Sequence, residues 1–403
     1  MSVPADLRVY LDHAATTPMV PAAVEALIGA LSPAGNSSSL HASGRRSKAL
    51  LEDAREGLAA AVGAHPSEVV FTSGGTEADN LAIAGTYAAR TREEPAARGI
   101  VTSSIEHHAV LEPTEALVAA GAHVIHAVAD TDGIISADSI ADALEVLRTR
   151  SVRPALVSVM WANNEIGTIQ PVAAIADLAQ ENGAQVHSDA VQAVGRVPLS
   201  FRDSGLHLLS LSGHKLGGPM GVGALIVARD AVIEPVVHGG GHERGLRSGT
   251  VPVPLAAALA AAVSHAVSVR KEESSRLVAL RDRLIEGLLG LDLDLTVGGA
   301  WTPGSAHDRL PGNVHIIVPG CDADSLLFLL DAAGIEASTG SACQAGVPGR
   351  SHVLDAIGVS TDQPVGAVRL TLGHTSTGDD VERAISAVRE CVPRARAAAG
   401  VLA

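Results

Sequence analysis

Short apolar runs alternate with amphipathic runs through the first half of this chain, and this alternation restricts the fold more than any other feature. Strand-like runs occur at 69–71, 99–102, 124–128, 156–160, 186–188, 208–212 and 222–227, with helical runs at about 43–63, 110–120, 137–147 and 172–182. Strands that alternate with helices at this spacing form a mainly parallel sheet with helices on both faces. We therefore predict an α/β fold.

The pattern changes after a long alanine-rich helical run at about 254–289, which we expect to bridge two parts of the chain. Strand-like runs then occur at 293–297, 314–318, 335–338 and 369–372, with helical runs at 323–333 and after Asp379. This mixture predicts a smaller α+β domain, and a chain of 403 residues is long enough for two cores. We predict a large domain over 14–253 and a small domain over 1–13 plus 254–403.

The charge and composition exclude several classes of protein. The formal net charge is −15 and the pI is about 5.5, which disfavours binding to nucleic acids or to anionic membranes. The first residues do not form a signal peptide, and no uninterrupted apolar run reaches the roughly 18 residues that a spanning helix needs. We expect a cytoplasmic protein that contacts neither nucleic acid nor membrane.

One lysine stands where a surface lysine is not expected. Lys215 ends the segment SLSGHK (210–215), directly after the apolar run 206–209, and small residues and glycines surround it. A buried ammonium without a partner is costly, so such a lysine usually shifts its pKa or forms a Schiff base with an aldehyde cofactor. The alternative is a lysine that caps a turn, and the hexapeptide alone does not decide between the two.

Two further polar groups follow strand-like runs, where ligands bind in parallel sheets. Asp189 is either the partner of a pyridinium nitrogen or a helix N-cap. Glu106, His107 and His108 begin a helix; adjacent histidines do not share a helical face and no ligand spacing recurs, so we expect no zinc site. Acid–base catalysis or stacking on a flat ring remains open for these histidines.

The segment TSGGTE (72–77) lies between a strand-like and a helical run. Small residues at this position make either an anion site at a helix N-terminus or an ordinary strand–helix turn.

The three cysteines are too few and too scattered for a disulfide framework or a Cys-x-x-Cys metal site. Cys343 lies in STGSACQAG (338–346), a run of small residues that predicts an exposed loop and does not suit core packing. Cys321 and Cys391 lie beside or within helical patterns and suit packing. Cys343 is therefore the candidate reactive thiol.

Taken in order, these segments resemble the cysteine desulfurases of the fold-type I, class V aminotransferase superfamily. The motifs are LDHAATTP (11–18), FTSGGTEADN (71–80), ANNEIGTIQP (162–171), HSDAVQAVG (187–195), SGHKLGGP (212–219), HGGGHERGLRSGT (238–250), GSAC (340–343) and RLTLG (369–373). Several long motifs in the correct order are more specific than any one alone. The resemblance covers nearly the whole chain and implies a fold-type I, seven-stranded-type sheet, pyridoxal 5′-phosphate as cofactor, and a homodimer.

The resemblance also implies a role for each matching residue. Lys215 would bind the cofactor covalently and move the substrate α-proton, and Cys343 would accept the sulfur. The implied cofactor contacts are Asp189 at the pyridine nitrogen, His107 on the ring and in proton transfer, Asn164 and Gln192 on the ring hydroxyl side, and Gly75, Thr76, Ser212, His214 and the second subunit's Thr250 at the phosphate. Asn36 and Arg369 would bind the substrate carboxylate, Arg369 in bidentate geometry.

The implied activity is the conversion of L-cysteine to L-alanine, with the sulfur held as a persulfide on Cys343 for an Fe–S scaffold or a tRNA-thiolation partner. No resident metal is implied, although Cys343 would be able to contact a transferred Fe–S cluster. The alternatives on the same fold are a selenocysteine lyase or another class V aminotransferase-like enzyme. A non-catalytic sulfur-transfer scaffold is the alternative of another class; it predicts loss of Lys215 or Cys343, and both are present.

Overall fold

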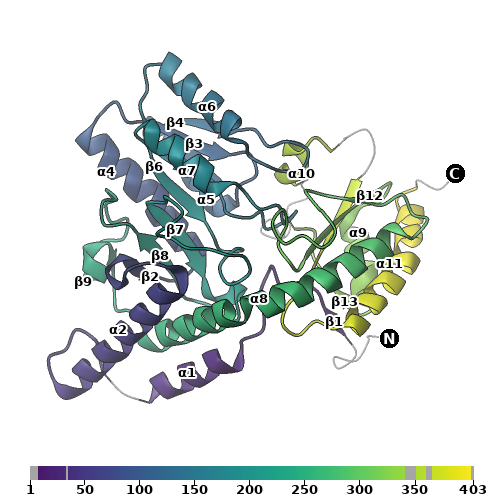
Figure 1. Cartoon of the computed structure of the whole chain (residues 1–403), viewed down its shortest axis with the longest axis horizontal. Helices are drawn as coiled ribbons and strands as arrows, with labels where there is room; N and C mark the ends of the chain where they lie inside the picture. The colour runs from purple at the N-terminus through teal and green to yellow at the C-terminus, as the bar shows by residue number, and fades with distance from the viewer. Residues whose placement is uncertain (1–7, 33–34, 341–350, 360–364, 401–403) are drawn as a thin grey trace.

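The computed structural model describes residues 8–32, 35–340, 351–359 and 365–400, and its largest element is a seven-stranded sheet (Figure 1). The strand order is β2-β8-β7-β6-β5-β3-β4. The strands are β2 (Val69–Thr72), β3 (Gly99–Ser103), β4 (His123–Ala127), β5 (Pro154–Ser158), β6 (Gln185–Asp189), β7 (Leu208–Ser212) and β8 (Gly223–Val227). Strands β4, β3, β5, β6 and β7 pair in parallel, and β8 is antiparallel to β7 and β2. The predicted mainly parallel sheet is confirmed.

Helices cover both faces of this sheet because successive strand residues point to opposite sides. Val69 and Phe71 pack in a core with α2 (Ala42–Val62), α6 (Ala137–Thr149), α7 (Val172–Glu181) and the first half of α8 (Val253–Leu289). Val70, between them, packs in a core on the other face with α3 (Gly75–Asn80), a π-helical turn (Leu81–Gly85) and α5 (His108–Val118). α4 (Thr86–Glu93) lies beside this second group. The alternation read in the sequence thus reflects a sheet buried on both faces.

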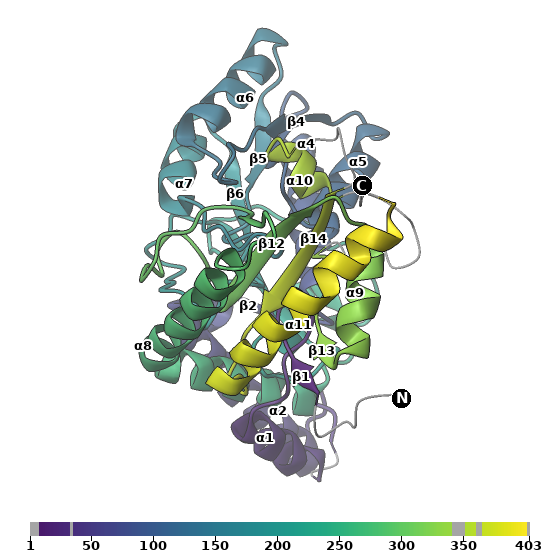
Figure 2. The same ribbon diagram turned by 90° about the vertical axis from the view of Figure 1, so that its right-hand side faces the viewer.

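A second part of the molecule is built on three antiparallel strands in the order β11 (Thr296–Val297), β12 (Asn313–Pro319) and β14 (Val365–Thr371). α9 (Ala323–Ala332) and α11 (Gly378–Ala398) pack beside these strands (Figure 2). The N-terminal β1 (Val9–Tyr10) pairs in parallel with β13 (Ile335–Glu336). The strands expected at 293–297 and 335–338 shorten to two residues each, because continuous pairing covers only these residues; Ser338 forms an isolated bridge with Arg369. Cys321 and Cys391 are buried in this core, as their sequence context predicts.

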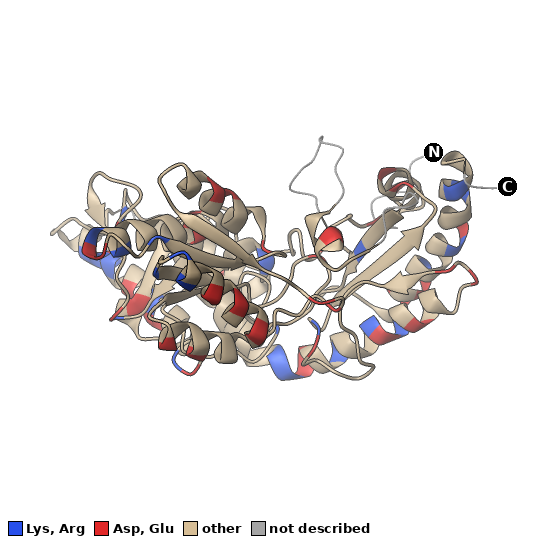
Figure 3. Ribbon diagram, turned by 90° about the horizontal axis from the view of Figure 1, so that it is seen from above, with Lys and Arg blue, Asp and Glu red and all other residues tan. Residues whose placement is uncertain are grey.

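The remaining described elements connect or flank these two parts. They are α1 (Pro21–Leu31), β9 (Gly241–His242), β10 (Arg247–Ser248), α10 (His352–Ala356) and three 3₁₀ turns at Pro66–Glu68, Gly213–Lys215 and Glu243–Gly245. Asp and Glu residues occur on the outer helices of both parts, interspersed with Lys and Arg (Figure 3).

Helix α8 joins the two parts, as the sequence predicts (Figure 1). Leu259 in its first half lies in the large core with the sheet, whereas Leu284 in its second half lies in the core of the second part. By length and composition alone, α8 is apolar enough to cross a membrane, although polar residues such as Ser264 and His265 interrupt its apolar run. Core helices pass the same test, and residues from the two halves of α8 lie in the two protein cores.

Candidate active site

A cavity of about 340 Å³ lies where β6 and β7 end, which is where ligands collect in sheets of this kind. It brings together residues from segments far apart in the sequence. The predicted residues that line it are Gly75, Thr76, His107, Asn164, Asp189, Gln192, Ser212, His214, Lys215 and Arg369. The size lies within the range usual for sites that bind small molecules, roughly 300–1,000 Å³. Most of the predicted site is therefore one continuous cavity.

Lys215 lies in a 3₁₀ turn directly after β7, so the buried strand holds its backbone at the cavity wall. Its Nζ donates hydrogen bonds to the carbonyl oxygens of Ala14 (2.7 Å) and Ala15 (2.9 Å). Ala14 and Ala15 line the same cavity. The amine is thus held between the end of the sheet and the N-terminal segment.

Asp189 ends β6 and is almost fully buried. Its Oδ1 accepts a hydrogen bond from the Val191 N–H at 2.9 Å in a local turn. The same side chain also lines the cavity. Burial raises the pKa of Asp189 to about 6, although the Val191 N–H and the nearby Lys215 favour the ionised form. At pH 7 this carboxylate is mainly ionised, as required to pair with a pyridinium nitrogen.

His107 is the N-cap of α5, and its Nδ1 accepts a hydrogen bond from the Ala109 N–H at 3.1 Å. Burial, with a smaller effect of Lys215, lowers the pKa of His107 to about 4. The ring is therefore neutral at pH 7, and the accepted bond at Nδ1 places its proton on Nε2. A neutral imidazole at the cavity wall suits both stacking and proton transfer.

Arg369 on β14 brings a cation to the cavity from the second part of the molecule. Its Nη2 donates to Asp12 Oδ1 at 3.0 Å and its Nη1 donates to the Asn164 carbonyl at 2.9 Å. Its buried Nε has no hydrogen-bond partner among the described residues. Because Arg369 lines the cavity, its guanidinium charge would attract an anionic ligand there.

The residues expected at the cofactor ring and phosphate also have defined partners. Gln192 donates through Nε2 to the Ala14 carbonyl at 2.9 Å, and its Oε1 accepts from Arg196 at 2.7 Å. His214 contacts Thr16 Oγ1 through Nδ1 at 3.0 Å, and burial lowers its pKa to about 4. Neutral His214 would therefore meet a phosphate as a hydrogen-bonding group rather than as a cation.

Three predicted site residues are not among the described residues that line this cavity. Asn36 is exposed, and its Oδ1 accepts a bond from the Ser38 N–H at 2.9 Å in a local turn. Thr250 is exposed just after β10. Cys343 lies outside the described residues. The roles of all three remain predictions.

Two carboxyl groups near the cavity had no role assigned from the sequence. Asp79 on α3 lines the cavity and is 1% exposed, and its Oδ1 lacks a hydrogen-bond partner among the described residues. Burial and the nearby Asp189 raise its pKa well above the ordinary range. The motif FTSGGTEADN contains Asp79, but helical spacing alone does not show that it faces a second carboxyl group.

Glu165 is the second carboxyl group near the cavity that had no role assigned from the sequence. It lies against Gly340 and accepts a hydrogen bond from Ser351 Oγ at 2.6 Å through Oε2. Gly340 and Ser351 are the described residues on either side of 341–350. Glu165 therefore ties the two ends of the segment that contains Cys343 to the ANNEIGTIQP motif.

Glu106 gives a first prediction, which concerns stability. Its buried Oε1 accepts from Ser103 Oγ (2.5 Å) and from the Met160 N–H (2.8 Å), and burial raises its pKa from 4.5 to about 8. Between these values the folded state holds a proton that the unfolded state has lost, so the free energy of unfolding falls as pH rises. We expect Glu106→Gln to remove this fall, which is on the order of 3 kcal/mol between pH 5 and 8.5.

Urea unfolding at the two pH values measures the difference. Glu115→Gln, at an exposed position of the same helix region, should keep the wild-type pH dependence. Equal pH dependence in wild type and Glu106→Gln would contradict a protonated Glu106.

Residues 9–384 match the family model described as Aminotransferase class-V. The chain belongs to the class-V aminotransferase family. Enzymes of this family use pyridoxal 5′-phosphate. The cavity holds groups that fit this cofactor and an acidic substrate, namely the Lys215 amine, the ionised Asp189, the neutral His107 ring and the Arg369 guanidinium.

Relatives within the class-V aminotransferase family are similar over almost their whole length. An "IscS-like cysteine desulfurase" of Mycobacterium tuberculosis is 52% identical over 391 residues, which is 97% of this chain and 98% of that protein. A "Cysteine desulfurase IscS" of Methanosarcina thermophila is 42% identical, covering 96% and 93% of the two chains. A solved structure named "NIFS-LIKE PROTEIN" superposes with a TM-score of 0.85 at 33% identity, covering 96% of this chain and all of that one. These similarities confirm the fold-type I architecture.

Proposed function

We propose that this chain is a cysteine desulfurase that converts L-cysteine to L-alanine and transfers the sulfur to Cys343. The observation that carries the proposal is the single cavity shared by Lys215, Asp189, His107 and Arg369. The near full-length similarity to proteins named cysteine desulfurases supports the same activity. Transferase chemistry with pyridoxal phosphate is common to these relatives.

Each residue of the cavity has a task in this proposal. When bound, pyridoxal phosphate acts as an electron sink that makes the substrate Cα–H acidic. Asp189 keeps the pyridine nitrogen protonated, Lys215 holds the cofactor and moves the α-proton, and His107 stacks on the ring and transfers protons. Arg369 binds the substrate carboxylate. Asn164 and Gln192 contact the ring hydroxyl side of the cofactor. The phosphate is bound by Gly75, Thr76, Ser212, His214 and the partner subunit's Thr250.

The sulfur step belongs to Cys343. Its thiolate attacks the substrate sulfur, so a new S–S bond forms while the substrate Cβ–S bond breaks. The electron pair of the broken bond stays with the carbon skeleton, which is protonated to alanine. Cys343 then carries a persulfide for transfer to an acceptor protein in Fe–S cluster assembly or tRNA thiolation.

The proposal extends to organisation and location. We propose a cytoplasmic homodimer in which residues 14–253 form the cofactor domain and residues 1–13 plus 254–403 form the domain with the Cys343 segment. The pairing of β1 with β13 supports the assignment of the N-terminus to the second domain. The first half of α8 packs in the large core, so the boundary at 254 falls at the start of a helix that both domains share.

Incubation of the purified enzyme with L-cysteine tests the activity. We expect the amount of alanine to equal the summed amounts of sulfide and enzyme persulfide. The purified enzyme should also show an absorption band of the bound cofactor. Alanine formation from L-selenocysteine alone would favour the selenocysteine lyase alternative. A chain that binds no cofactor and forms no alanine would favour the scaffold alternative.

Arg369→Lys gives a prediction for substrate binding. A lysine cannot offer the planar fork that binds a carboxylate through two parallel bonds, so we expect KM for L-cysteine to rise at least about tenfold. The effect on kcat should be smaller because Arg369 does not take part in bond breaking. Steady-state kinetics measures both constants.

The exposed Arg389 on α11 offers a matched control, since Arg389→Lys should leave both constants unchanged. The cofactor absorption spectrum should also remain that of the wild type in Arg369→Lys. An unchanged KM in Arg369→Lys would rule out the carboxylate role.

A further inference from the structure

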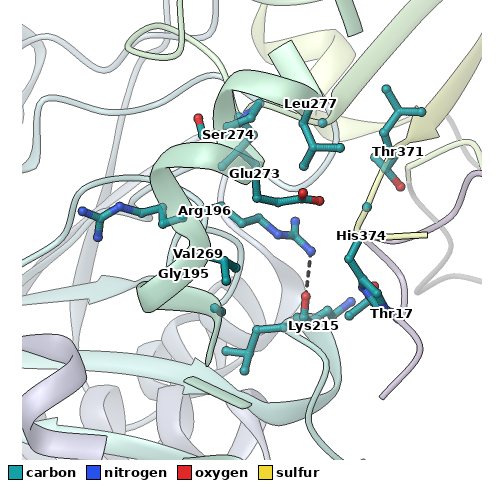
Figure 4. A pocket seen from close by; sticks show the side chains of 18 of the residues that line it. Thr17, Gly195, Arg196, Lys215, Val269, Glu273, Ser274, Leu277, Thr371 and His374 are labelled. Carbon is teal, nitrogen blue, oxygen red and sulfur yellow. Dashed lines mark hydrogen bonds between the residues drawn. The ribbon is translucent and has the colours of Figure 1, made fainter. Parts of the chain in front are cut away.

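A second cavity of about 340 Å³ lies behind the candidate active site. Ala14 and Lys215 line both cavities, so they form part of the wall between them. The other walls come from α8, from residues 194–196 and from the segments next to β12 and β14. Figure 4 shows Arg196 lying beside Lys215 in this cavity, with α8 residues around it. The cavity thus lies at the junction of the two parts of the molecule.

Apolar side chains supply much of its wall. They come from the large core, from α8 and from the segment before β12, and include Val194, Leu216, Val269, Leu277 and Leu310. An apolar wall of this kind favours a ligand with an apolar body. Charged groups are present as well, and their pairing determines which ligand fits.

Arg196 is the charged group that distinguishes this cavity. Its guanidinium donates to Gln192 Oε1 (2.7 Å), to the Lys215 carbonyl (2.7 Å) and to the His13 carbonyl (3.3 Å). All three acceptors are neutral, and Arg196 forms no ion pair within the described ranges. Burial lowers the pKa of Arg196 to about 10, yet it stays charged at pH 7. A partly buried cation without a counter-charge is unfavourable.

Neighbouring Arg276 shows the contrast. It lines the same cavity, but its Nη2 lies 2.7 Å from Glu273 Oε1 in an ion pair. Arg276 therefore has its counter-charge within the protein, and Arg196 does not. Arg270 and Glu272 also line the cavity and have opposite charges, so with Arg276 and Glu273 paired a single negative charge on a ligand would balance Arg196.

We propose that this cavity binds a small organic monocarboxylate, with the carboxylate against Arg196 and the apolar body against α8. Three of the five N–H donors of Arg196 are used in the bonds above, which leaves donors for a ligand oxygen. Arg196 also donates a hydrogen bond to the carbonyl of Lys215, which lines the active-site cavity. The Arg196 side chain would therefore connect a bound carboxylate to the wall of the active site. The site is separate from Arg369, which faces the other cavity.

Calorimetric titration of the holoenzyme with 3-phenylpropanoate tests the proposal. This probe has one carboxylate and one ring, and 3-phenylpropanamide is its neutral counterpart. We expect one acid to bind per chain, at least about tenfold more tightly than the amide, because a charge-assisted hydrogen bond is stronger than a neutral one. Absence of binding, or equal affinity for acid and amide, would overturn the proposal.

Two variants locate the binding site. Val269→Trp fills the cavity and should weaken binding of the acid at least about tenfold; Val269 is 37% exposed, so the larger ring does not crowd a core. Ile28→Trp is the matched control on α1, where the side chain is 61% exposed and outside this cavity, and should bind as the wild type does. Unchanged affinity in Val269→Trp would place the acid elsewhere, such as at Arg369, and would contradict the proposal.

A third variant tests the recognising group. Arg196→Gln keeps a hydrogen-bonding side chain but removes the charge, so the preference for acid over amide should disappear. If that preference survives in Arg196→Gln, Arg196 does not recognise the carboxylate.

Discussion

Replacing Lys215 with alanine should lower the rate of alanine formation from L-cysteine by at least about 10³-fold, the largest effect that we expect from a single substitution. The variant loses the amine that holds the cofactor and the base that moves the α-proton. It also loses two hydrogen bonds to the carbonyl oxygens of Ala14 and Ala15. Borohydride should attach the cofactor permanently to the wild-type peptide that contains Lys215, and should attach none in the variant.

The chain offers two matched controls, since Lys48 and Lys271 are its only other lysines. Both are exposed, Lys48 on α2 and Lys271 on α8, and neither lines the active-site cavity. Lys48→Ala and Lys271→Ala should keep wild-type rates and borohydride labelling. A Lys215→Ala protein with a borohydride-stable cofactor on another lysine would refute the role of Lys215.

Cys343→Ala should reduce sulfide release at least about 100-fold while leaving cofactor binding intact, because the thiolate is the nucleophile and alanine offers none. Mixing the variant with L-cysteine should still change the absorption spectrum of the cofactor, since substrate binding depends on Arg369 and Lys215. Mass spectrometry of the wild type under single turnover should show one additional sulfur on the peptide that contains Cys343.

Cys391→Ala is the matched control for this experiment. Cys391 is 1% exposed, and burial raises the pKa of its thiol, so it is a poor nucleophile. The variant should be slightly less stable but fully active. Wild-type sulfide release by Cys343→Ala would show that the sulfur leaves by another route.

Burial determines the charge state of the candidate active site. It lowers the pKa of His107 and of His214 to about 4, so both rings are neutral at pH 7. Asp189, with a pKa of about 6, is mainly ionised there. Below pH 6 its protonation would remove the partner of the pyridine nitrogen, so cofactor affinity should fall on the acid side.

The order of apolar and polar residues was sufficient to predict the sheet and its helices. The alternation of Val69, Val70 and Phe71 between two cores explains why the strand-like runs are apolar throughout. The expected strand at 293–297 was too long, because pairing with β12 determines how many of its residues join the sheet. Local patterns report burial, whereas strand length depends on a partner distant in sequence.

The same division applies to the site. The sequence by itself determined that Lys215 and Asp189 end neighbouring buried strands, because parallel strands place their polar ends at one edge. The motif that contains Arg369 already implied its place in the site, but only the tertiary structure brought the carbonyl of Ala14 to that edge, left Arg196 without a counter-charge, and placed Asp79 beside the cavity. The reason is physical: burial and long-range contacts determine the charge state and pairing of these groups, and no local spacing encodes them.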